Sequence, residues 1–235
     1  MVDAACTVGR NKVDVEVGAM AINQKIPTGI TRRAQYFIRI HGHWTGRADI
    51  EQYRARWMEH GVPGAQIDRV SAYEAVWGGL ALPPSPHYDG GPRTLSGDLP
   101  EGPDPDWHFE AGLQRTALPY SFMIGPNGEF GLHAGDWVPL HSTVEGWVEA
   151  VALADHARRC ARTTTTVTGD AVDELDLKGF ERVPEVAALA DTWWRGPDSL
   201  IAIYRGEAEV MNAPQCRTAT VYGGLDKWGL RGLDT

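Results

Sequence analysis

Apolar and polar residues recur along the N-terminal half of the chain with spacings that predict one strand followed by two helices. The segment 34–44 is rich in aromatic and β-branched residues, which is typical of a strand. Apolar residues recur at helical spacing in 49–60 and again in 65–77, so both segments are predicted to be helices. Gly78 follows directly and is expected to take the left-handed conformation that ends many helices. Upstream, 12–18 alternates with period two and is predicted to be an edge strand.

The middle of the chain combines a long irregular segment with a clear hairpin signal and a clear helix signal. Residues 83–112 are rich in Pro, Gly and Asp and show no periodicity, so they are predicted to form a long surface loop. The segments 120–124 and 129–133 flank a Gly-Pro-Asn-Gly turn, which predicts a β-hairpin because Asn-Gly adopts the positive φ angles of a tight turn. An amphipathic helix follows, with Ser142 as its predicted N-cap and Glu145 completing a capping box.

The C-terminal third is predicted to contain a strand, a helix and a three-stranded meander. Four consecutive threonines at 163–166 favour a strand. The segment 183–195 carries a proline in its first turn and is followed by Gly196, which is typical of a short helix. The strands of the meander are predicted at 199–204, 207–212 and 218–222.

Composition and charge narrow the class of protein. Apolar residues make up 43% and charged residues 23% of the 235 residues, which is typical of a globular chain with a core. The net charge of −9 argues against nucleic-acid binding, which needs a basic surface. Residues 61–160 hold 5 basic and 13 acidic side chains, so the acidity is concentrated in the middle of the chain. An acidic patch attracts a basic protein partner, although it also serves as a solvated surface.

The cysteine content and the distribution of apolar residues indicate in which cellular compartment the protein is expected. Cys6, Cys160 and Cys216 are isolated and odd in number, which predicts neither a disulfide framework nor a zinc ribbon. Charged residues interrupt the N-terminal segment, so no signal peptide is expected. The chain also has no apolar run long enough to span a membrane. A cytoplasmic location is the expectation.

Two short motifs resemble a known family. Tyr73-Glu74, Trp77-Gly78-Gly79-Leu80 and Pro83 are similar to the aromatic-acidic and aromatic-Gly-Gly-Leu-x-x-Pro signature of the SMI1/KNR4 (SUKH) superfamily. Leu140-His141-Ser142 and Gly146-Trp147 resemble the closing segment of that family. The resemblance covers about residues 65–160.

The resemblance implies a fold and a class of function. It implies an α+β fold in which a mixed, largely antiparallel sheet is packed by helices. Many bacterial members are immunity proteins that bind and neutralise a toxin domain, and others are interaction or regulatory modules. The family shares no catalytic residues, so the residues carried over are structural: Gly78 and Gly79 at the helix exit, and Trp77 and Trp147 in the core.

The hydrophobic pattern and the family resemblance together predict the fold class and the division of the chain into parts. The class is α+β, with a mixed, largely antiparallel sheet packed by helices and a small C-terminal α/β extension. We expect an N-terminal arm at 1–33, a main domain at 34–162 and a C-terminal part at 163–235. The C-terminal part is predicted to pack on the main domain.

The long irregular segment contains the first candidate site. Carboxylates concentrate there at Asp98, Glu101, Asp104, Asp106 and Glu110. Trp107 lies among them, which predicts a recognition loop in which the tryptophan anchors and the acids steer a basic partner. The alternatives are a solvated loop and a paired-carboxylate hydrolase site. Trp193 and Trp194 cannot both face one side of a helix, so Trp194 is a further candidate for partner contact.

Histidines give the second candidate site. His41 and His43 lie two residues apart on the predicted strand, so both would project from one face at a spacing that suits two metal ligands. His87, Asp89, His108 or His133 could supply a third ligand. The alternative is a pair of surface or hydrogen-bonded histidines, and we therefore expect no metal and no cofactor. Cys160 follows two arginines, but its place beside an apolar stripe fits a buried structural thiol.

Two hypotheses of function follow. The first is a cytoplasmic protein-binding module whose acidic middle third steers a protein partner, such as a basic toxin domain. The second is a small enzyme or biosynthetic accessory protein with His41, His43, His87 and Asp89 in a cleft between the main domain and the C-terminal part. No residue is assigned a catalytic role, and neither nucleic acid nor membrane is expected as a partner.

Overall fold

The computed structural model describes residues 26–232, so the edge strand predicted at 12–18 lies outside the described residues. The helices are α1 Arg32–His41, α2 Arg54–Glu59, α3 Gly64–Trp77, α4 Val144–Cys160, α5 Gly206–Val210 and α6 Lys227–Arg231. Short 3-10 helices occur at η1 Ile50–Tyr53, η2 Tyr88–Gly90, η3 Gly169–Val172, η4 Pro184–Val186 and η5 Pro214–Cys216. Within 26–232, no helix combines the length and the apolar character needed to cross a membrane.

The strands form two larger sheets and two small ones. The strands of the first half are β1 His43–Trp44, β2 Leu80–Ala81, β3 Pro92–Leu95, β4 Phe109–Glu110, β5 Gly112–Gln114, β6 Ser121–Ile124, β7 Phe130–His133 and β8 Trp137–His141. Those of the C-terminal part are β9 Thr163–Thr168, β10 Glu181–Arg182, β11 Thr192–Arg195, β12 Ser199–Tyr204 and β13 Thr218–Gly223. One sheet has the order β4-β6-β7-β8 and the other β10-β11-β12-β13-β9, while β1 pairs with β2 and β3 with β5.

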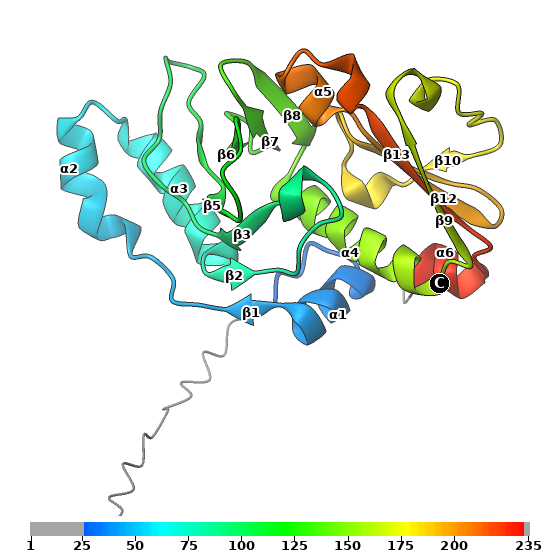
Figure 1. Cartoon of the computed structure of the whole chain (residues 1–235). Helices are drawn as coiled ribbons and strands as arrows, with labels where there is room; N and C mark the ends of the chain where they lie inside the picture. Colours follow the sequence, from blue (N-terminus) through cyan, green and yellow to red (C-terminus); the bar gives the residue numbers. More distant parts are fainter. Residues whose placement is uncertain (1–25, 233–235) are drawn as a thin grey trace, which may run out of the picture.

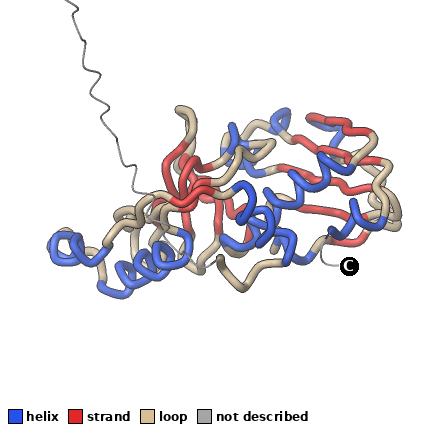
Figure 2. The backbone as a smooth tube through the Cα atoms, turned by 90° about the horizontal axis from the view of Figure 1, so that it is seen from below, coloured by secondary structure: helices blue, strands red, loops and turns tan. Residues whose placement is uncertain are grey.

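Antiparallel sheets packed by helices confirm the predicted α+β class (Figures 1 and 2). The hairpin of β6 and β7 is also confirmed, as are the helices at 49–60, which splits into η1 and α2, and at 65–77, which is α3. The strand predicted at 163–166 is confirmed as part of β9.

One hydrophobic cluster, the main core, joins both larger sheets through α4. Trp147, Val148 and Leu153 of α4 are buried in it together with Phe122 of β6 and Leu200 of β12. Residues on both sides of position 162 therefore share this core. The far face of the five-stranded sheet forms a second cluster that includes Ile201 and Ile203 of β12, because successive side chains of a strand point to opposite faces.

The strand predicted at 34–44 is wrong over most of its length, since α1 occupies Arg32–His41. Thr31 caps this helix, and its side-chain oxygen accepts a hydrogen bond from Ala34 N (3.2 Å). Ala34, Phe37 and Ile38 are buried, and their spacing of three and four residues is helical. The aromatic and β-branched content favoured a strand, but the capping residue and the apolar spacing specify a helix.

Three further predictions are wrong downstream of α1. The helix at 183–195 is instead η4 followed by β11, which pairs with β12 along its whole length. The central meander strand at 207–212 is the short helix α5. The segment 83–112 is not a plain surface loop, because it contains β3 and β4 and buries Tyr88 and Leu95.

Two caps also differ from the prediction. Gly78 has φ of −54°, whereas Gly79 has φ of +79° and takes the left-handed conformation. Gly78 is nevertheless required, because a Cβ there would clash with the side chain of Glu74. Thr143, not Ser142, is the N-cap of α4, and its side-chain oxygen accepts from Gly146 N (3.1 Å).

The motif residues serve the fold. Trp77 and Trp147 are buried in the main core, as expected. The buried carboxylate of Glu74 accepts hydrogen bonds from Ala48 N and Gly97 N (both 2.8 Å), and the Tyr73 hydroxyl donates to Ala111 O (2.6 Å). These contacts tie the end of α3 to neighbouring loops.

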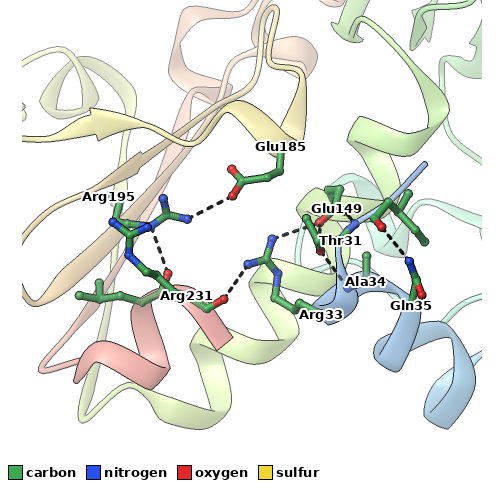
Figure 3. A network of polar contacts seen from close by, with 10 residues as sticks. Thr31, Arg33, Ala34, Gln35, Glu149, Glu185, Arg195 and Arg231 are labelled. Carbon is green, nitrogen blue, oxygen red and sulfur yellow. Dashed lines mark hydrogen bonds and ion pairs between the residues drawn. The ribbon is translucent and has the colours of Figure 1, made fainter. Parts of the chain in front are cut away.

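A buried polar network joins α1 to α4 and to the C-terminal helix (Figure 3). The guanidinium of Arg33 lies 3.0 Å from a carboxylate oxygen of Glu149 and also donates to Arg231 O (3.4 Å). The hydroxyl of Thr31 donates to the same oxygen of Glu149 (2.8 Å), and the other oxygen accepts from Thr31 N. Burial raises the pKa of Glu149, while the contacts with Thr31 and Arg33 act in the opposite direction. The network fixes where α1 lies on α4.

Candidate functional site

The acidic residues singled out by the sequence lie on a loop that is closed at its base. Glu101 N donates to His108 O (2.7 Å) and His108 N donates to Glu101 O (2.8 Å), so these two residues form an antiparallel bridge. The residues between Glu101 and Asp106 are exposed. Gly102 has φ of +117°, a conformation that favours glycine. This acidic loop, from Glu101 to His108, therefore holds Asp104 and Asp106 at its exposed tip.

Further carboxylates surround the base of the acidic loop. Burial raises the pKa of Glu110, and the negative charges of Asp98 and Glu101 raise it further. Asp98 and Glu101 are therefore close enough to Glu110 for their negative charges to act on its carboxyl group. Like charges held near one another in this way favour the approach of a positively charged group.

A cavity of about 410 Å³ lies beside the acidic loop. It is lined by Glu101 and Asp106 of the loop together with His108, Met123, His133 and Trp137. The pairing of β7 with β8 sets His133 opposite Trp137. The ring of His108 packs edge-on against the indole of Trp137, with 4.7 Å between ring centroids. The indole lies over Gly131, where a Cβ would come within 2.7 Å of it.

The charge of His108 determines the electrostatics of this cavity. Its Nδ1 donates a hydrogen bond to Asp106 O (2.8 Å), because a carbonyl oxygen can only accept. Burial lowers the pKa of His108, so the ring is neutral at neutral pH. The cavity thus has carboxylates at its rim, and its wall contains the neutral ring of His108 beside the indole of Trp137. Carboxylates and an indole together suit a cationic side chain, through ion pairing and a cation–π contact.

No family model, curated protein or solved structure matches this chain. The geometry of the acidic loop and its cavity therefore carries the functional argument. The sequence named His133 as a possible third metal ligand and did not single out Trp137, although a signal for the pairing of the two was present. The hairpin predicted at 120–133 and the short connection to the next strand would place them opposite each other on neighbouring strands.

The two predicted tryptophan anchors do not line this cavity. Trp107 is half-buried and packs against the main core, and its carbonyl accepts from Arg69 Nη1 (3.3 Å). Trp194 lies on β11, packs on the second cluster and is covered by Arg182, whose guanidinium lies 5.2 Å from the ring centroid. Contact of either residue with a partner stays a prediction.

The histidine site is not assembled. His41 ends α1 and accepts a hydrogen bond from Arg159 (3.3 Å), whereas His43 is exposed on β1, so the two do not share one strand face. The half-buried His87 ring packs on Tyr204 with centroids 3.6 Å apart, and Asp89 accepts from the Thr116 hydroxyl (3.1 Å). Across residues 26–232, no group of three or more His, Cys, Asp or Glu side chains is placed to hold a metal ion.

His141, at the end of β8, is buried, and its burial should make the stability of the fold depend on pH. His141 Nδ1 donates to Val186 O (2.7 Å), and burial lowers its pKa from 6.5 to about 4. As the pH falls, His141 is therefore protonated in the unfolded chain before it is protonated in the folded chain. Its contribution to stability is thus present above pH 6.5 and is lost as the pH falls. Asparagine can keep the hydrogen bond but cannot titrate. Relative to His141→Asn, the wild-type free energy of unfolding should fall by about 1.4 kcal/mol per pH unit between pH 6.5 and about 4.

Urea unfolding at several pH values measures this difference. His43→Asn is the matched control, because His43 is exposed. Its stability should follow the wild type at every pH. Parallel pH profiles of wild type and His141→Asn would show that His141 is not held neutral by the fold.

Proposed function

We propose that this chain is a cytoplasmic protein-binding module of the SUKH type, which binds and neutralises a basic protein partner such as a toxin domain. The observation that supports this most directly is the exposed acidic loop, which the Glu101–His108 bridge closes at its base and which lies beside a cavity lined by Glu101, Asp106 and Trp137. This arrangement of carboxylates and an indole suits a basic side chain of a partner. The residues that the motifs contribute serve the scaffold that presents this loop.

Charge steering is the proposed first step of binding. Asp104 and Asp106 are exposed at the tip of a loop whose base is fixed, so their field acts on a partner before contact. Steering of this kind raises association rates and is weakened by salt. In the second step a lysine or arginine side chain of the partner enters the cavity beside Trp137. There it meets Glu101, Asp106 and the neutral ring of His108.

The partner can be sought among toxin domains encoded next to the gene. Each domain is expressed in a susceptible host with and without the full chain, and rescue of growth identifies a partner. Failure of every adjacent toxin to be neutralised would contradict the immunity role.

Charge reversal tests the steering step on a partner identified in this way. Asp104→Lys with Asp106→Lys should slow association about tenfold at low salt and much less at high salt. The matched control is Glu174→Lys with Asp176→Lys, which changes the net charge equally at two exposed positions with the same spacing. Stopped-flow measurement of the association rate gives the comparison. Equal slowing by both pairs would mean that net charge, not the acidic loop, guides the encounter.

A further inference from the structure

Helices α1 and α6 both pack on α4 (Figure 1). Residues of all three helices line a largely apolar groove. Its volume is about 370 Å³. Its walls include Tyr36 and Phe37 of α1, Ala152, His156 and Cys160 of α4, and Trp228 of α6. Tyr36 and Trp228 are 48% and 49% exposed, and Ile40 lies one helical turn beyond Tyr36 with 53% exposure. Half-exposed large side chains gathered in this way are typical of a binding surface. We call it the aromatic groove.

The polar atoms on the floor of the aromatic groove are already engaged within the chain. His156 Nε2 donates to Trp228 O (3.0 Å), and burial lowers the pKa of His156, so the ring is neutral. Burial raises the pKa of the Cys160 thiol, which is therefore protonated. Arg33 is paired with Glu149. The floor consequently offers an apolar surface and little hydrogen bonding to a ligand.

The surroundings of the aromatic groove are basic, although the whole chain carries a charge of −9. Arg39 is exposed on α1, and Lys227 and Arg231 are exposed on either side of Trp228. Arg158 and Arg159 share one carboxylate, that of Asp155. Asp226 caps α6. Among residues 26–232, the exposed bases named here outnumber these two acids, so this part of the surface attracts negative charge.

We propose that the aromatic groove binds an acidic peptide segment of a protein, with one apolar side chain inserted between Tyr36 and Trp228. The basic surroundings match the charge of such a segment, and the apolar floor matches the inserted side chain. A nucleotide base would need hydrogen-bond partners that the floor lacks. A membrane surface would be met by protruding side chains, whereas this site is hollow. The site is separate from the acidic loop and takes the opposite charge, so it adds a second interface to the proposed function.

Two labelled peptides test the proposal. Both consist of aspartate and glutamate, and they differ only in a central leucine or serine. Fluorescence anisotropy with the full chain at low salt should show binding of the leucine peptide and at least about tenfold weaker binding of the serine peptide. Tyr36→Ala and Trp228→Ala should each weaken the leucine peptide about tenfold, as expected for anchoring side chains. Leu113→Ala is the matched control, since Leu113 is an exposed apolar residue outside the groove, and it should bind like the wild type.

Several outcomes would overturn the proposal. Equal binding of the two peptides would mean that the surface attracts charge but inserts no side chain. Absence of binding to either peptide, or equal loss on Leu113→Ala, would remove the groove as the site. Binding of phosphatidylserine vesicles or of oligothymidylate that depends on Tyr36 and is not displaced by the leucine peptide would assign the groove to a membrane or a nucleic acid.

Discussion

Replacing Glu149 by leucine should lower the free energy of unfolding by about 3–5 kcal/mol. Glu149 and Arg33 are only 2% and 4% exposed, and their side chains lie 3.0 Å apart (Figure 3). The substitution deprives the buried guanidinium of this carboxylate and also removes the acceptor of Thr31. A buried charge that loses its partner keeps its desolvation cost, which explains the large expected effect. Urea denaturation at neutral pH measures it.

A double-mutant cycle separates this cost from loss of packing. Arg33→Met combined with Glu149→Leu should be destabilised by less than the sum of the single changes, because the double variant leaves neither charge of the pair in the interior. Arg158→Met on the same helix is the control, since Arg158 is 71% exposed and its contact with Asp155 should contribute about 1 kcal/mol or less. Additive single changes would show that the pair is not coupled. A loss on Glu149→Leu no larger than that on Arg158→Met would show that the network does not hold α1 on α4.

Local sequence signals predicted the elements that local chemistry determines. The Asn-Gly turn closes the hairpin of β6 and β7, and the apolar stripe of α4 is buried as its periodicity requires. In contrast, β11 is a strand because it pairs with β12, and Trp193 and Trp194 then point to opposite faces. The sequence of the segment 183–195 is typical of a helix, so nothing local to these two tryptophans predicted the pairing of β11 with β12.

How well each candidate site could be predicted from the sequence also depends on how far apart its residues lie along the chain. The carboxylates of the acidic loop are neighbours in sequence, so composition alone revealed their concentration. The wall of the adjacent cavity comes from β7 and β8. Predicting it would have required knowledge of how these two strands pair in the sheet. The aromatic groove brings Tyr36 together with Trp228 from the far end of the chain, and no periodicity links residues so widely separated.

The buried carboxylate of Asp191 should be the second large contributor to stability. Tyr88 OH donates to both of its oxygens (2.7 Å each), and the backbone N–H groups of Arg205 and Gly206 donate to one of them (3.0 and 3.3 Å). Asp191 thereby joins η2 of the main domain to the start of α5. Asp191→Ala leaves these buried donors without an acceptor and should lower the free energy of unfolding by about 3 kcal/mol or more. Tyr88→Phe removes a single hydroxyl and should cost about 1 kcal/mol.

Asparagine at position 191 keeps an acceptor but cannot ionise, so it tests the charge separately. Burial raises the pKa of Asp191 from 3.8 to about 7, so the folded chain keeps a proton that the unfolded chain releases. Stability from this group is therefore greatest at low pH and is lost as the pH rises. Relative to Asp191→Asn, the wild-type free energy of unfolding should fall by about 1.4 kcal/mol per pH unit between about pH 4 and 7, opposite in sign to the effect at His141. A difference that stays constant over this range would show that Asp191 remains ionised and is held by its donors alone.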